Sequence, residues 1–105
     1  MIAGSGSSIN KTGTVSSTAE SLVGFGFSAG DVAAADRVII CVTANALRLT
    51  WDHPTANLPT GTAGLRLPTN NYPLFILQGR SDIAALQMIR DASSDATVSI
   101  TLERS

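Results

Sequence analysis

The chain has 105 residues, of which 44% are hydrophobic and only 14% are charged, and its formal net charge at pH 7 is -1. This length fits one domain with a single core, and the near-neutral charge excludes a basic surface for nucleic acid or an anionic membrane. One cysteine excludes an intrachain disulfide, and no apolar stretch reaches the ~20 residues that a membrane span needs. So few charges on a soluble chain favour a surface that copies or partners partly cover.

The N-terminal residues predict an arm rather than part of the core. Residues 1–12 are rich in glycine and serine, with only isolated isoleucines, and cannot bury enough apolar area to order themselves. We therefore expect a flexible arm over residues 1–12, which is either a frayed terminus or a segment that orders only against a neighbour, and a single domain over residues 13–105. The start of the chain lacks the charged-then-apolar order of a secretory signal, which fits assembly in a cytoplasm.

Short extended segments begin after this arm. Residues 14–18 are β-branched, and residues 21–27, "SLVGFGF", alternate large apolar residues with glycines, so each predicts a strand. Residues 30–36, "GDVAAAD", predict one short helical turn with Asp31 as its N-cap.

The middle of the chain gives the clearest β pattern. Residues 37–43, "RVIICVT", are nearly all apolar, which predicts a strand buried on both faces with Cys41 as a small buried hydrophobe. Residues 47–51, "LRLTW", alternate strictly and direct Leu47, Leu49 and Trp51 inward. We expect these two strands to pair as a hairpin.

The remaining elements are shorter and less regular. Residues 52–64 hold two prolines and two glycines and predict a long loop, followed by strands at residues 63–67 and 72–78. One helical turn is expected at residues 82–85, and then a hairpin over residues 86–103.

About eight short strands at spacings of roughly 8–12 residues are typical of an all-β fold. The sequence therefore predicts an antiparallel β-sandwich or jelly-roll-like small barrel with one or two short helical turns. It contains no internal repeat.

The only tryptophan and the only histidine stand together where a predicted strand ends. Trp51, Asp52 and His53, with Tyr72 and Arg66, are the candidate binding residues of a loop or interface. One interpretation makes Trp51 an aromatic platform that stacks on a sugar or a partner peptide. The other makes it the last residue of the inward face formed by its strand, and the unbroken alternation favours this second interpretation.

Catalysis finds little support in the residue pattern. A lone histidine cannot build a multi-histidine metal site, and no G-x-S-x-G elbow accompanies the many serines. We expect no catalytic residues, no metal and no cofactor. The arginines on or beside strands are expected to form a solvated face, or to pair in an assembly with a neighbour's carboxylates, such as Asp52, Asp82 and Asp91.

Two stretches carry a resemblance to a known class of protein: "LRLTWDHPTANLPTGTAGLRLPTNNYPLFILQG" and "SDIAALQMIRDASSDATVSITLE". With the segments around them, from about residue 20 to about residue 103, they resemble the small all-β virion proteins of tailed bacteriophages. In those proteins a strand ending in Trp precedes a Pro/Thr/Gly loop, a "G-x-x-L" strand and a last alternating strand. The resemblance implies a decoration or cement protein of the capsid, some of which are trimers, and it brings no catalytic residues.

We therefore expect a non-enzymatic structural protein of a virion, which bridges capsomers as a homotrimer and binds the major capsid protein or another virion protein. It would be located in the virion after assembly in the host cytoplasm, with no nucleic-acid or membrane partner. The alternative is a carbohydrate- or receptor-binding β-module of a fibre or tail that uses the Trp51 loop.

Overall fold

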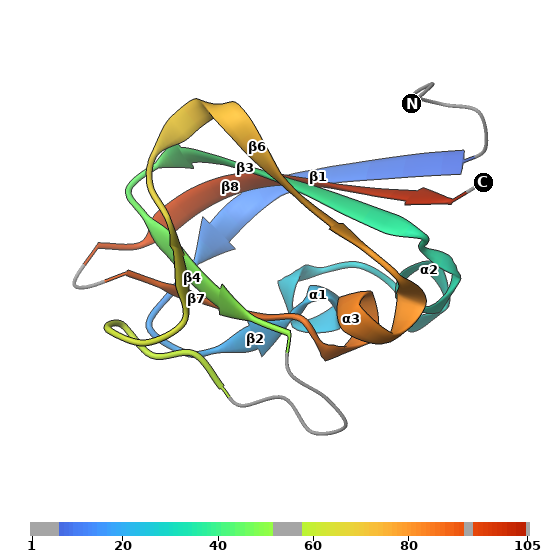
Figure 1. Cartoon of the computed structure of the whole chain (residues 1–105), viewed down its shortest axis with the longest axis horizontal. Helices are drawn as coiled ribbons and strands as arrows, with labels where there is room; N and C mark the ends of the chain where they lie inside the picture. Colours follow the sequence, from blue (N-terminus) through green and yellow to red (C-terminus); the bar gives the residue numbers. More distant parts are fainter. Residues whose placement is uncertain (1–6, 52–57, 92–93, 105) are drawn as a thin grey trace.

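The computed structural model describes residues 7–51, 58–91 and 94–104, and their backbone is mostly β (Figure 1). Eight strands in this part form two four-stranded antiparallel sheets. Sheet A has the order β1 (Ser7–Val15), β8 (Ala96–Arg104), β3 (Arg37–Ala44) and β6 (Asn70–Gln78). Sheet B has the order β2 (Glu20–Ser21), β7 (Gln87–Arg90), β4 (Leu47–Thr50) and β5 (Leu65–Leu67). The expectation of a mostly β chain with antiparallel sheets is confirmed, and these strands do not close into one barrel.

Pairing joins strands that are far apart in the sequence. Strand β1 pairs with β8, β2 with β7, β3 with β6 and β4 with β5, while β8 also pairs with β3 and β7 with β4. The expected hairpins over residues 37–51 and 86–103 are therefore wrong. Both edges of β3 are already occupied, by β8 and β6, so β4 cannot pair with it. The chain crosses instead to the other sheet at Asn45, whose φ is 61°.

The segment expected to be a flexible arm begins outside the described residues, but its second half is a strand. Residues 7–12 lie in β1, which pairs with β8 continuously from Ser7 opposite Arg104 to Val15 opposite Ala96. The backbone donors and acceptors of a polar segment need partners, and the C-terminal strand of the same chain supplies them. A neighbouring molecule is not needed to order residues 7–12.

The strand predicted for residues 21–27 is wrong, because helix α1 (Leu22–Phe25) occupies this segment. The Ser21 hydroxyl accepts a hydrogen bond from the Gly24 amide at 3.2 Å and caps the helix. Gly26 ends it with a φ of 135°, a conformation that favours glycine. One helical turn buries Leu22 and Phe27 and leaves Val23 48% exposed, which an alternating strand would not do.

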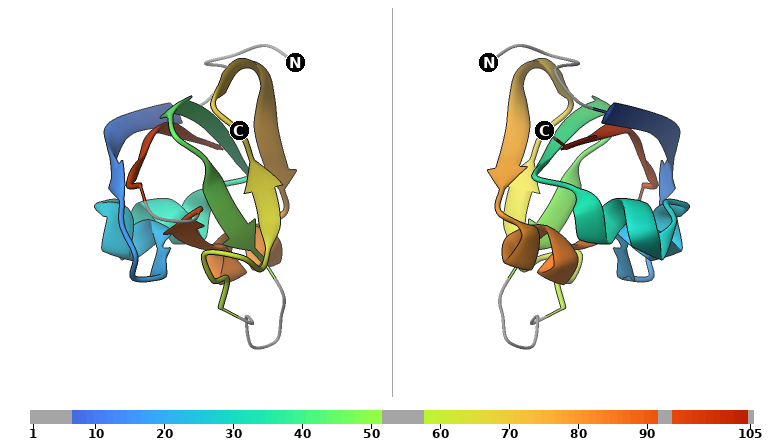
Figure 2. Two further views of the ribbon diagram at one scale, coloured as in Figure 1. Left: turned by 90° about the vertical axis from the view of Figure 1, so that its left-hand side faces the viewer. Right: turned by 90° about the vertical axis from the view of Figure 1, so that its right-hand side faces the viewer.

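Two further helices lie beside α1 at one end of the molecule (Figures 1 and 2). Helix α2 (Ala29–Ala34) covers the predicted turn, but its N-cap is Ser28, whose hydroxyl accepts from the Asp31 amide at 3.1 Å. Helix α3 (Arg80–Ala85) confirms the helical turn expected at residues 82–85. The helices contribute Leu22, Val32 and Ile83 to the core.

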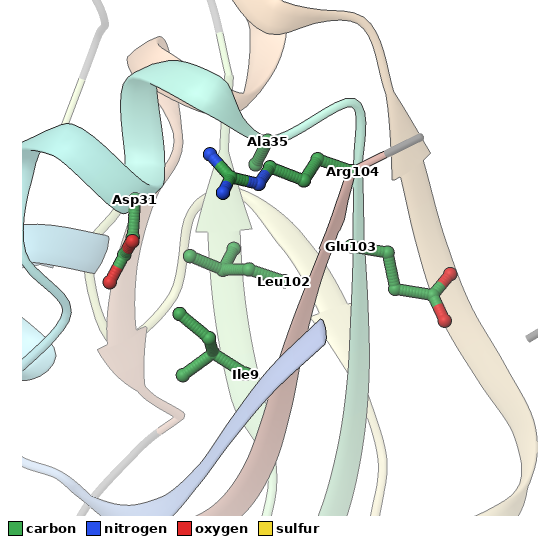
Figure 3. A pocket seen from close by; sticks show the side chains of 6 residues that line it. All are labelled: Ile9, Asp31, Ala35, Leu102, Glu103 and Arg104. Carbon is green, nitrogen blue, oxygen red and sulfur yellow. The ribbon is translucent and has the colours of Figure 1, made fainter. Parts of the chain in front are cut away.

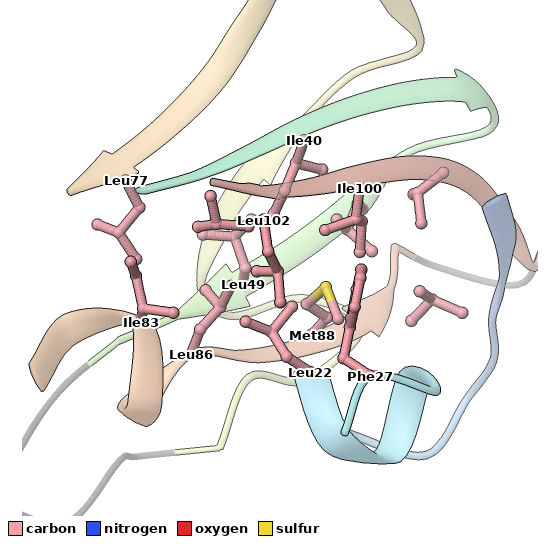
Figure 4. Packing of buried hydrophobic residues seen from close by; sticks show 14 of the residues in the cluster. Leu22, Phe27, Ile40, Leu49, Leu77, Ile83, Leu86, Met88, Ile100 and Leu102 are labelled. Atoms are coloured by element: carbon pink, nitrogen blue, oxygen red, sulfur yellow. The ribbon is translucent and has the colours of Figure 1, made fainter. Parts of the chain in front are cut away.

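The core lies between the two sheets and the helices (Figure 4). Strand β3 buries only alternate residues, so the prediction of burial on both faces is wrong, and Cys41 is partly exposed on the outer face of sheet A. Inward residues of the central strands are more than nine-tenths buried, among them Ile40, Leu49, Met88, Val98 and Ile100. No helix in the described part of the chain is long and apolar enough to span a membrane.

Candidate interaction surface

The predicted loop cluster is only partly described by the structure. Asp52 and His53, and the side chain of Tyr72, lie outside the described residues. Trp51 follows β4, is partly buried, and packs against the core and against Phe75, with ring centroids 5.4 Å apart. The two preceding inward leucines of β4 are fully buried, so the predicted alternation is confirmed. Trp51 forms the rim of the core at this end of sheet B.

Arg66 belongs to a charged cluster that joins strands of sheet B. Its Nε donates to Oδ2 of Asp91 at 2.9 Å, and Nε of Arg48 donates to Oδ1 of the same carboxylate at 2.6 Å. Arg48 and Arg66 are direct cross-strand neighbours on β4 and β5. Like charges in these positions destabilise a sheet unless an anion joins them. The hydrogen bonds from Arg66 and Arg48 lower the pKa of Asp91 below its usual value.

The arginines expected to form a solvated face, or to pair with a neighbour's carboxylates in an assembly, have carboxylate partners in the same chain. Arg37 pairs with Glu103 and Arg80 with Asp36 in the same chain, as Arg48 and Arg66 do with Asp91. These contacts stabilise the subunit. Arg66 still has 51% of its side chain exposed and can take part in a further contact.

One small cavity lies where α2 meets the ends of β1 and β8 (Figure 3). The side chains of Ile9 and Leu102 lie close together in it, with Asp31 and Arg104 at its sides, while Glu103 points away. Its volume is about 40 Å³, room for one or two water molecules and too little for a sugar ring. The described residues also contain no group of three or more His, Cys, Asp or Glu placed to hold a metal ion.

The largest feature missed by the sequence analysis is the outer face of sheet A, the side turned away from the core. It consists of the alternate register positions of the four strands that are turned away from the core: Ser8, Asn10, Thr12, Thr14, Arg37, Ile39, Cys41, Thr43, Ile76, Gln78, Thr97, Ser99, Thr101 and Glu103. Arg37 and Glu103 are its only ionisable pair, with Nη2 of the arginine 2.7 Å from Oε1 of the glutamate. None of the other residues named here is Asp, Glu, Lys, Arg or His.

Several polar side chains on this face are hydrogen-bonded to one another or to its backbone. The Asn10 amide donates to Oγ of Ser99 at 3.0 Å and to Oγ1 of Thr101 at 2.9 Å. Oγ1 of Thr43 donates to the Thr97 carbonyl at 3.1 Å. Alternating polar residues in β1 and β8 are visible in the sequence, but only the pairing shows that they share one surface.

Comparison with known proteins adds no identification. No family model, no curated protein and no solved structure matches this chain.

Proposed function

We propose that this protein is a non-enzymatic structural protein of a tailed-phage virion, which decorates or cements the capsid as a homotrimer. The observation that carries the proposal is the outer face of sheet A, a four-stranded surface whose described side chains include one internally neutralised ion pair and no other charged group. Protein interfaces are depleted of charged residues at their centres, whereas a sheet face exposed permanently to water gains solubility from charges. A protein whose role is to cover and join surfaces needs such a face.

The strand pairing supports a jelly roll. Pairs β1–β8, β2–β7, β3–β6 and β4–β5 are those of one long hairpin, and the pairs β8–β3 and β7–β4 arise when that hairpin is rolled into two sheets. Jelly rolls occur in viral capsid proteins and in lectins, so this fold fits the proposal and also its alternative. Because one fold serves many functions, the surface rather than the topology decides between them.

A cement protein works by burying area. It would bind the major capsid protein or another virion protein across a capsomer junction, so that expansion of the shell must break its contacts as well. Three weak contacts around a trimer act together through avidity. The protein would be assembled in the host cytoplasm and remain in the virion.

Particles of the virus that encodes this chain provide the test. We expect the protein in purified particles in many copies, and density for it above the capsid lattice in a cryo-EM map. Particles made without it should release their DNA at a lower temperature. The proposal is wrong if the protein is absent from particles, or if its removal changes neither the map of the shell nor its heat tolerance.

A carbohydrate- or receptor-binding module is the second candidate, favoured by the aromatic pair of Trp51 and Phe75 at the rim of the core. Since Trp51 is the only tryptophan, its fluorescence reports on this place alone. Under the main proposal the emission is blue-shifted by core contact and does not respond to added glycans. A saturable change with one glycan class would support the module instead.

A further inference from the structure

We infer that the outer face of sheet A is the surface through which copies of this chain bind one another. The inference rests on the proposed function for the number of copies, three, and on the structure for the choice of face. The occupant is a second copy of the chain, and the argument uses charge, hydrogen bonding, exposed apolar area and size.

Charge favours an identical neutral surface as the partner. Other charged residues of the described strands occupy other positions: Arg48 and Arg66 lie on sheet B, and Lys11 alternates with the outer-face residues of β1. A strongly charged partner would gain no attraction here and would lose its own hydration. A second copy brings the same uncharged face, so neither surface has an unpaired charge to dehydrate.

Several polar groups on the face already have hydrogen-bond partners within the same chain. The amide of Asn10 holds the hydroxyls of Ser99 and Thr101, and Arg37 holds Glu103. Burial of a polar group is costly mainly when it loses its hydrogen-bond partner. These groups keep their partners when water is removed, and serine and threonine lose little side-chain entropy on contact.

Apolar area concentrates on the β3–β6 half of the face. Ile39 and Cys41 are partly exposed on β3, and Ile76 on the edge strand β6 is 50% exposed. The β1–β8 half consists of hydroxyl-bearing residues with Asn10 and Glu103. In a ring of three copies each subunit contacts two neighbours. The two halves of its face would then contact different neighbours, in heterologous contacts that close the ring.

The size of the face fits such an assembly. Four strands spaced by about 4.8 Å and about nine residues long cover roughly 600 Å² in projection, and a standard interface takes about 800 Å² of accessible surface from each partner. Accessible surface exceeds its flat projection, so the whole face supplies about the area of one standard contact, and in a ring this area is divided between two smaller contacts.

Self-association is measured on the purified full-length chain, without capsids. Light scattering and sedimentation should give three times the 10.8 kDa chain mass for the wild type. Ile76→Lys and Thr12→Lys each place a charge at an exposed position of the face and should give monomers. Ala33→Lys, at an exposed position of α2, adds the same charge elsewhere and should remain trimeric. Circular dichroism checks that each variant is folded.

The alkylation rate of Cys41 gives a second measurement of contact between copies, and it can be made on the wild type. Cys41 is the only cysteine and lies on the face, so contact between copies should make its alkylation by a maleimide about tenfold slower at high than at low protein concentration. In Ile76→Lys the alkylation rate should not depend on concentration.

The outcomes separate this inference from the proposed function. A wild type that stays monomeric at every concentration, or an oligomer that neither face variant disrupts, overturns the inference, while binding to capsids is decided by the particle experiment. A dimer that both face variants dissociate supports the face as the contact and overturns the threefold copy number in the proposed function.

Discussion

The pair Leu49 and Leu65 offers a direct test of where the core ends. The two leucines are opposite one another on β4 and β5, yet Leu49 is fully buried and Leu65 on the edge strand is 46% exposed. We expect Leu49→Ala to destabilise the protein about three times as much as Leu65→Ala. The chemical change is the same in both, so the difference measures burial alone.

The magnitudes follow from the area that each side chain removes from water. A leucine-to-alanine change deletes three carbon atoms, at about 0.8 kcal/mol for each buried one, or about 2.5 kcal/mol for Leu49. The cavity left in a closed core raises this to about 3–4 kcal/mol. At Leu65 about half of the transfer energy is at stake and solvent fills the space, so about 1 kcal/mol is expected.

Urea unfolding followed by Trp51 fluorescence gives both free energies of unfolding. All variants are compared at one chain concentration, because association of folded copies would add to the measured stability. The slope of the free energy against urea should stay unchanged, which shows that both variants unfold to the same extent. Equal losses for the two variants, or a loss below about 1 kcal/mol for Leu49→Ala, would contradict the described core.

Two further predictions concern the charged cluster and a turn. Asp91→Asn removes the anion between Arg48 and Arg66 and should lower the urea midpoint at neutral pH. Because the pKa of Asp91 is lowered in the folded state, its contribution is present above about pH 4 and is lost as the pH falls through that lowered pKa. The advantage of the wild type over the variant should therefore shrink as the pH falls, and an advantage that is the same at neutral pH and at pH 2 would refute this role. Gly64→Ala should lower the melting temperature, since Gly64 has a φ of 113° and a Cβ there would lie 3.1 Å from a backbone oxygen of β4. Gly30→Ala in α2, with no atom within 4 Å of the new Cβ, should raise it or leave it unchanged, and a reversed order would contradict the turn geometry.

Alternation along single strands was predictable because it depends on the local sequence. The pattern of residues 47–51 correctly places Leu47, Leu49 and Trp51 on the inward face. The same rule predicted burial on both faces for residues 37–43. This prediction was wrong, because the outward positions Ile39 and Cys41 are apolar as well. An apolar run does not reveal whether its second face meets a core or another molecule.

Pairing could not be predicted from local pattern. A turn that returns a strand beside its predecessor and a turn that carries it across to the facing sheet require the same kind of residues. The left-handed Asn45 between β3 and β4 fits either one. The pairing depends on which strands occupy the two edges of β3. These edges are occupied by β6 and β8, which begin 26 and 52 residues after β3 ends.

The segment at residues 21–27 shows a conflict between a strand-like alternation and a helix-capping serine. Its alternation of apolar residues and glycines fits a strand, but Ser21 is followed three residues later by an amide that its hydroxyl can cap. A strand would have placed Val23 in the core. The helix places Leu22 and Phe27 there instead, and the left-handed Gly26 ends the turn.

The candidate surface was hidden from the sequence for a related reason. Chemically distinctive residues such as Trp51 and His53 drew the prediction to one loop, whereas the outer face of sheet A is distinguished by the near-absence of charge across four strands. Such an absence has no motif, and it becomes visible only when β1, β3, β6 and β8 are placed side by side. The charged residues of the described part lie mainly at other positions, several of them in ion pairs, and this leaves one nearly neutral surface. That segregation is what a subunit needs if it is to stay soluble alone and still bury a whole sheet face on assembly.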